Sequence, residues 1–156
     1  MPPRKYAPEI ARLKIWAWCD KAERCHWDVR QKLIDWGIPY EERETLISML
    51  IENNLLNEER YASAFAHDKF EFNQWGAKKI EQQLKLKGVS EHNIKNALKN
   101  IDPTDIASTI AAIIKKKEPQ FKGLQLYQKK MKLARFLYSK GFGQDIAWKE
   151  IEKYFS

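Results

Sequence analysis

The sequence predicts an all-α fold of three tandem three-helix repeats in an elongated, curved array, and three observations predict it. A motif of Leu-x-x-x-Gly followed by an apolar residue occurs three times in the 156 residues, with glycines at Gly37, Gly88 and Gly141. Apolar residues around these motifs recur at intervals of three and four, as they do in amphipathic helices. The sequence lacks the signals of strands and hairpins: it has no alternating run of β-branched residues and no Asn-Gly or Asp-Gly pair. Because one such unit buries little surface alone, neighbouring units are expected to stack into an array.

Each copy of the motif predicts the end of a helix. An apolar residue stands four positions before the motif's leucine (Val29, Ile80 and Leu133), so the two share one helical stripe. The glycine suits the left-handed conformation that ends a helix, and the apolar residue after it packs back on the last turn. The sequence therefore predicts three equivalent helix ends, one in each unit.

The other helices follow from apolar periodicity and from breaks in it. Residues 1–54 are expected to form the first unit, with helices near 8–24, 27–36 and 42–53. Residues 55–102 are expected to form the second unit, with helices near 58–73, 77–87 and 91–100. Residues 103–156 are expected to form the third unit, with helices near 104–117, 124–140 and 144–154.

Capping residues support several of these helix starts. Asn57 and Ser90 each precede a predicted helix and can accept a hydrogen bond from a first-turn amide. Asp102-Pro103 combines a cap with a proline in the first turn, where the missing N–H is not needed. The segment Glu118-Pro119-Gln120 is expected to break the chain between the seventh and eighth helices, because proline cannot continue a helix.

Composition is typical of a folded protein of the cytoplasm. Hydrophobic residues make up 44% of the chain and charged residues 31%. No uncharged apolar run approaches the 18 or so residues of a membrane span, and no secretory signal is expected at the start. Cys19 and Cys25, if they share a helix, lie about 9 Å apart along its axis, which is too far for a disulfide. We therefore expect reduced thiols, no membrane contact and a monomer.

The sequence offers no constellation of residues for catalysis. His26, His67 and His92 are the only histidines, and no Cys-x-x-Cys or His-Glu-x-x-His motif is present. Gly141-Phe142-Gly143 follows a helix instead of a strand, so it does not match a dinucleotide-binding loop. The expectation is a protein without enzymatic activity, metal or cofactor.

Positive charge concentrates in the last third of the chain. The net charge is +7, and residues 105–156 carry 11 Lys or Arg against 5 Asp or Glu, whereas residues 1–52 carry 9 of each. Such asymmetry favours an anionic partner, although a merely solvated helix face would also explain it. Tyr127 can stack on a base or simply pack. The candidate binding residues are Lys78, Lys79, Lys85, Lys87, Lys115, Lys116, Lys117, Lys122, Lys129, Lys130, Lys132, Arg135 and Lys140.

Three segments resemble the RecX family of RecA regulators. Leu55–Phe65 is similar to its pattern of an apolar pair, Asn or Asp, acidic residues, Arg, an aromatic and Ala. Trp75–Val89 resembles the family's next helix, and Arg135–Phe142 resembles its C-terminal signature. The first repeat is a looser match, with Trp36 at a position that is more often basic. The resemblance spans nearly the whole chain.

The resemblance implies a curved array that lodges in the helical groove of the RecA–single-stranded-DNA filament. There it would inhibit the ATPase, strand-exchange and coprotease activities of RecA. Two alternatives stay open from the residues alone. One is a stand-alone DNA-binding helical module, since three-helix units superficially resemble helix-turn-helix domains. The other is a scaffold with no nucleic-acid role.

Overall fold

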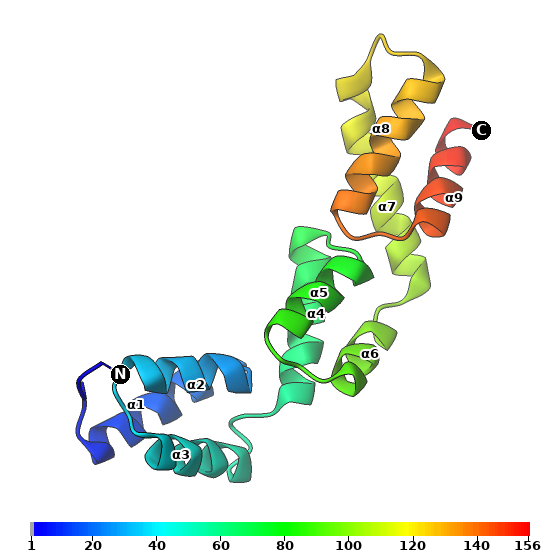
Figure 1. The fold of residues 1–156 in the computed structure, drawn as a ribbon. Helices are drawn as coiled ribbons and strands as arrows, with labels where there is room; N and C mark the ends of the chain where they lie inside the picture. Colours follow the sequence, from blue (N-terminus) through cyan, green and yellow to red (C-terminus); the bar gives the residue numbers. More distant parts are fainter. Residues whose placement is uncertain (1) are drawn as a thin grey trace.

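The computed structural model describes residues 2–156, and within that range it is all helical (Figure 1). The first unit holds α1 (Pro8–Lys21), α2 (His26–Asp35) and α3 (Tyr40–Glu52). The second unit holds α4 (Glu58–Asn73), α5 (Ala77–Leu86) and α6 (Glu91–Lys99). The third unit holds α7 (Pro103–Lys117), the 3-10 helix η1 (Glu118–Phe121), α8 (Leu126–Ser139) and α9 (Gln144–Phe155). The three units follow one another along a bent, elongated molecule, which confirms the predicted fold class.

The three glycine motifs adopt the same turn. Gly37, Gly88 and Gly141 all have positive φ, between 70° and 98°. In each case the amide of the next residue donates to the carbonyl of the motif's leucine at 3.1 Å, five residues back. This bond belongs to the left-handed helix ending that the motif predicts. The residues that follow the glycines are all buried: Ile38, Val89 and Phe142.

The predicted caps are also present. The amide of Arg60 donates to Asn57 Oδ1 at 2.9 Å, and the amide of Asn93 donates to Ser90 Oγ at 3.2 Å. Asp102 Oδ1 accepts from the amide of Thr104 at 2.8 Å, with Pro103 as the first residue of α7. These bonds satisfy first-turn amides that have no partner inside the helix.

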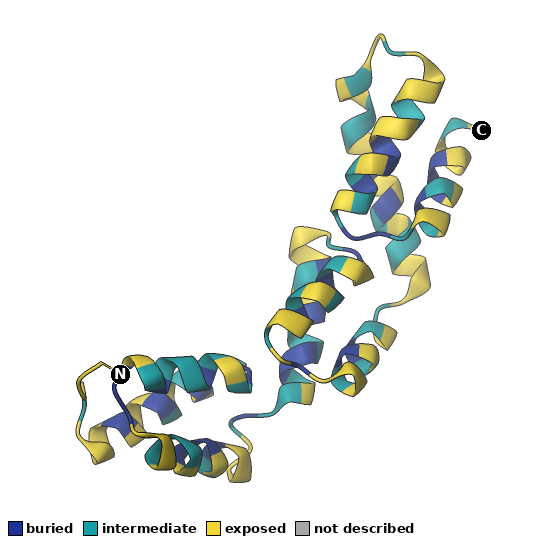
Figure 2. Cartoon of the chain, in the orientation of Figure 1, coloured by how far each residue is buried: buried dark blue, intermediate teal, exposed yellow. Residues whose placement is uncertain are grey.

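The buried residues fall into three clusters, one for each unit (Figure 2). Ile15, Leu33 and Leu50 lie in the first cluster, Ile80 and Leu84 in the second, and the third is formed by α7, α8 and α9. Ile106 packs against both the second and the third cluster, so the cores of these two units nearly meet. The domain boundaries 1–54, 55–102 and 103–156 stay a prediction. Among residues 2–156, no helix is both long and apolar enough to cross a bilayer.

Side chains join the first unit to the second. Arg60 Nε pairs with Glu23, Lys87 Nζ pairs with Asp28 Oδ1 at 2.8 Å, and the amide of His26 donates to Glu58. The Cys25 side chain, at the start of α2, lies within the core of the second unit. Among the described residues, no backbone–backbone hydrogen bond links helices α1–α3 to helices α4–α6.

Backbone groups join the second unit to the third. The amide of Gly76 donates to the carbonyl of Lys140 at 2.7 Å, and the amide of Lys78 donates to the carbonyl of Gly141 at 3.1 Å. The N-terminus of α5 therefore lies against the C-terminus of α8, an arrangement in which the two helix dipoles attract. No side chain caps α5, so these carbonyls satisfy its first amides instead.

The predicted first helix, 8–24, is three residues too long. Helix α1 ends at Lys21, and Ala22 is extended. Arg24 folds back so that its Nε donates to the carbonyl of Trp18, and its guanidinium lies 4.0 Å from the Trp18 ring centroid. Cys25 instead caps α2, where its sulfur accepts from the amide of Asp28. The two cysteines consequently do not share a helix; both are free and buried.

Candidate nucleic-acid interface

Two helical stripes in the third unit face each other across a shallow groove. On α7 the stripe is Ile113, Lys116 and Lys117, and it continues to Gln120 in η1. On α8 it is Lys132, Arg135, Phe136 and Ser139. Residues spaced three, four and seven apart share one side of a helix, which explains why each set lines the same space. We call this space the α7–α8 groove.

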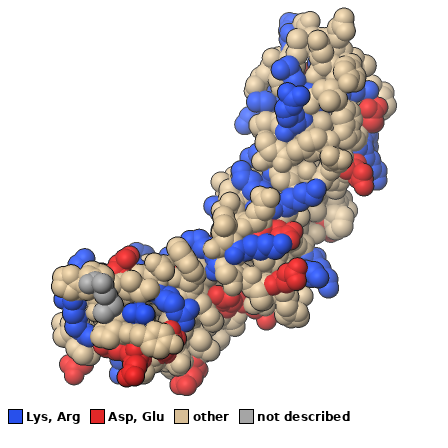
Figure 3. Space-filling model, in the orientation of Figure 1, with Lys and Arg blue, Asp and Glu red and all other residues tan. Residues whose placement is uncertain are grey.

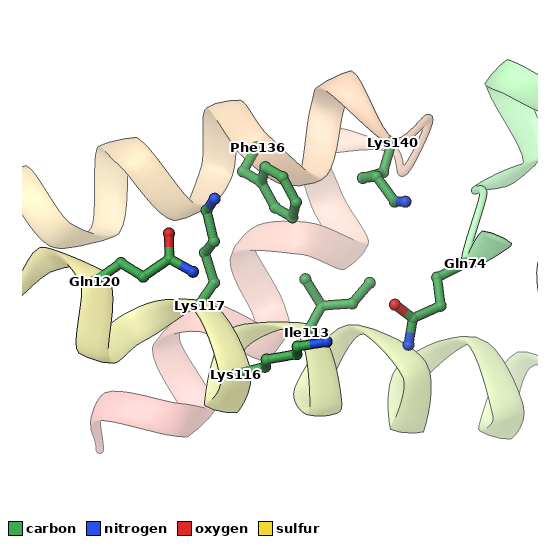
Figure 4. A pocket seen from close by; sticks show the side chains of 7 residues that line it. All are labelled: Gln74, Ile113, Lys116, Lys117, Gln120, Phe136 and Lys140. Atoms are coloured by element: carbon green, nitrogen blue, oxygen red, sulfur yellow. The ribbon is translucent and has the colours of Figure 1, made fainter.

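The groove comprises two cavities that share Lys117 and Phe136. The inner cavity has a volume of about 180 Å³ and is closed at one end by Gln74 and Lys140 (Figure 4). The outer cavity has a volume of about 310 Å³, and Phe121 forms part of its lining. Of the described residues, no Asp or Glu lines either cavity, whereas five basic residues do: Lys116, Lys117, Lys132, Arg135 and Lys140. The groove is therefore electropositive with an apolar aromatic floor.

Phe136 is held in place between the core and the groove. Its ring packs on the third hydrophobic cluster but remains partly exposed. Lys117 Nζ lies 4.4 Å from the ring centroid, within the range of a cation–π interaction. The adjoining side of α8 supplies core residues such as Leu133 and Leu137. The α8 helix thus presents an aromatic ring and cations together on its groove side.

Positive charges crowd at the inner end of the groove. Lys140 Nζ donates to the carbonyl of Asn73 at 2.7 Å. Burial, with a smaller repulsion from Lys79, lowers the pKa of Lys140. The Cβ of Lys79 also lies near Gly141 in the junction between the units. A bound anion at this end would relieve the repulsion between the two ammonium groups.

Four of the predicted binding residues form ion pairs within the protein. Lys85 pairs with Glu81, Lys87 with Asp28, Lys129 with Glu118 and Lys130 with Glu152, at nitrogen–oxygen distances of 2.8 to 3.1 Å. The pair with Glu81 also raises the pKa of Lys85. Their charges are partly neutralised inside the chain, and none of the four lines the groove.

Three other predicted residues, Lys78, Lys115 and Lys122, are exposed but line neither cavity. Tyr127 is 71% exposed and also lies outside the groove. In Figure 3, Lys and Arg side chains recur over all three units, and acidic side chains lie at the lower edge of the first unit and also on the second and third units. The structure thus brings together five of the thirteen predicted residues, with Lys79 close to one of them.

The sequence-based prediction missed the aromatic residues of the site. Phe136 was noted only as part of a family signature, and Phe121 was not singled out. The spacing of Lys132, Arg135 and Phe136 would have placed an aromatic among cations on one helix side. Gln74 could not have been found, because it ends α4 in a left-handed conformation and comes from the neighbouring unit.

The described part of the chain holds no group of three or more His, Cys, Asp or Glu side chains placed to bind a metal ion. His67 is exposed and has only a long contact, 3.4 Å, with the neighbouring Asp68. Burial raises the pKa of Cys19 and of Cys25 to about 11, so both thiols stay protonated near neutral pH.

The fold and the groove together define an all-α repeat protein with a basic groove in its third unit. The family descriptions of the second and third three-helix domains of RecX match residues 57–98 and 105–151. A regulatory protein RecX of Haemophilus ducreyi is 30% identical over 122 residues, which cover 78% of each chain. The chain belongs to the RecX family of regulatory proteins.

Other relatives agree with this assignment. A regulatory protein RecX of Clostridium perfringens strain SM101 is 35% identical over 133 residues, covering 81% of this chain. The chain spans 59% of the length of that relative. A crystal structure of RecX from Lactobacillus salivarius has the same fold, with a TM-score of 0.87 at 20% identity over 95% of this chain and 96% of that one.

Proposed function

We propose that this protein binds the RecA–single-stranded-DNA filament in its helical groove. Bound there, it inhibits the ATPase, strand-exchange and coprotease activities of RecA. It acts as a cytoplasmic monomer and catalyses no reaction of its own. Membership of the RecX family is the observation that carries this proposal.

The shape of the molecule supports the proposal. Three units in series make a bent array that can follow a helical polymer over several subunits (Figure 1). The backbone hydrogen bonds from Gly76 to Lys140 and from Lys78 to Gly141 hold two of these units in a fixed relation. A preorganised surface loses less conformational entropy on binding than a flexible chain of domains would.

The charge of the third unit also supports the proposal. A groove that is lined by cations, and by no carboxylate from residues 2–156, suits the phosphates of filament DNA or an acidic surface of RecA. The same groove favours a second candidate function, that of a stand-alone DNA-binding module. This second function requires salt-sensitive binding to DNA without RecA.

RecA-catalysed, DNA-dependent ATP hydrolysis tests the proposal. The protein is titrated from far below to equal to the RecA concentration, with saturating single-stranded DNA. We expect hydrolysis to fall at substoichiometric ratios, because one bound array contacts several RecA subunits. Unchanged hydrolysis at every ratio contradicts the proposal, and DNA binding in that case would favour the stand-alone module.

A further inference from the structure

The α7–α8 groove combines two features that a solvated lysine face does not need. Five basic residues surround it, yet Phe136 and Ile113 form an apolar floor between them. Cations that serve only solubility are expected to point away from apolar surface and to alternate with carboxylates. Here the Lys117 ammonium lies over the Phe136 ring, and no Asp or Glu among residues 2–156 lines the cavities.

We propose that the α7–α8 groove binds a segment of single-stranded nucleic acid, with one base against Phe136 and the flanking phosphates on Lys132 and Arg135. The inference deepens the proposed function and rests on it, because it names which filament component this groove contacts. A base fits here on size, since the two joined cavities offer about 180 and 310 Å³. It also fits on chemistry, since the base has a π-face that can stack on Phe136, and the nucleic-acid backbone has phosphates that can pair with the cations.

An acidic peptide fits the same groove less well. Carboxylates would pair with Lys132 and Arg135, but Asp and Glu side chains have no aromatic face to stack on the Phe136 ring. The guanidinium of Arg135 is a bidentate donor that matches phosphate as well as carboxylate, so it does not discriminate. The aromatic floor is therefore the feature that decides in favour of nucleic acid.

The orientation of α8 explains why one helix can contact both the base and the phosphates. Lys132, Arg135 and Phe136 are spaced three and four apart, so their side chains leave the helix on one side. Leu133 and Leu137, on the adjoining side that faces the third hydrophobic cluster, are fully buried, which fixes the rotation of the helix. The Phe136 ring is thus held against the core before any ligand binds, and the exposed side chains of Lys132 and Arg135 extend from the helix beside it.

The test measures the affinity of the full chain for a fluorescein-labelled oligothymidylate by anisotropy, without RecA. We expect Phe136→Leu to raise Kd by roughly 5- to 150-fold, the range for loss of one stacked base. Phe136→Tyr is expected to keep near-native affinity, because it retains the ring. The Lys132→Glu/Arg135→Glu variant is expected to lower the slope of log Kd against log salt by about 1.4, since two phosphate contacts on a single strand are lost.

The matched control is Lys149→Glu/Lys153→Glu, which makes the same charge change on exposed residues of α9, outside the groove. Circular dichroism and urea unfolding establish that each variant is folded. Equal weakening by the two double variants, or native affinity in Phe136→Leu, overturns the inference. Displacement of the oligonucleotide by polyglutamate at equal charge concentration overturns it in favour of a peptide site. Because RecA is absent, these outcomes leave inhibition of RecA to be judged separately.

Discussion

Gly76 lies against Gly141 so closely that a Cβ added to Gly76 would be 2.4 Å from the carbonyl carbon of Gly141. The close approach lets the amide of Gly76 reach the carbonyl of Lys140. One glycine comes from the second unit and the other ends α8 in the third. The angle between these units therefore depends on the absence of a side chain at Gly76.

Gly76→Ala is predicted to destabilise the protein by about 1–3 kcal/mol, because the new methyl group meets backbone that cannot move without separating the units. Urea unfolding measures this change in the free energy of unfolding. Gly143→Ala is the matched control: Gly143 also caps a helix with ordinary negative φ, but an added Cβ there meets nothing within 4 Å. Equal destabilisation by both substitutions would show that capping, and not the close approach, is responsible.

The junction between the first and second units (the first junction) is predicted to loosen in salt more than the junction between the second and third units (the second junction). Its ion pairs, Arg60–Glu23 and Lys87–Asp28, are partly exposed and are screened at about 1 M salt, whereas the backbone bonds of the second junction are not. Spin labels at 48 and 95 report the first junction, and labels at 95 and 128 report the second; all three positions are exposed. High salt should broaden only the first distance distribution.

The Glu23→Gln/Asp28→Asn variant should reproduce that broadening at low salt. Complete separation of the first unit is not expected, because Cys25 remains buried in the core of the second unit. Broadening of both distributions to the same extent would mean that the two junctions do not differ.

The buried thiols are predicted to make stability fall as pH rises above 9. Burial raises the pKa of Cys19 and Cys25 from about 9.0 to about 11, so the unfolded chain releases these protons first. Ionisation in the unfolded chain favours unfolding. The contribution of the thiols to the free energy of unfolding is therefore lost between pH 9 and pH 11, and a difference of one in pKa corresponds to about 1.4 kcal/mol. Urea unfolding across this range measures the loss. A Cys19→Ala/Cys25→Ser variant should lose less stability over the same range.

Helix positions were predictable from the sequence because their signals are local. The glycines, Asn57 and Ser90 each act within a few residues of their own position, and all behave as expected. The predicted end of α1 is wrong, because the real end depends on Arg24 folding back onto Trp18. The chain can either form that contact or continue the helix, and the apolar periodicity does not show which conformation is more stable.

The α7–α8 groove was only partly predictable, because it depends on how distant segments pair. Lys87 is neutralised by Asp28, 59 residues away, and Lys130 by Glu152, 22 residues away. A count of charges along the chain cannot separate such paired lysines from those that stay available. The rotation of α8 against α7, set by the packing of α9, decides which cations reach Phe136.

The groove cations are predicted to be needed for inhibition of RecA. Lys132→Glu/Arg135→Glu should raise the concentration for half-inhibition of RecA ATP hydrolysis by roughly tenfold or more, since like charge then faces the filament DNA. Lys149→Glu/Lys153→Glu should change it little. If the α9 variant loses inhibition equally, net charge and not the groove governs binding.

Electron microscopy of RecA–single-stranded-DNA filaments decorated with this protein tests the central claim most directly. The account predicts elongated density along the helical groove, spanning several RecA subunits, with the α7–α8 side turned toward the DNA. Density confined to filament ends or to the outer surface, or undecorated filaments at saturating protein, would contradict it.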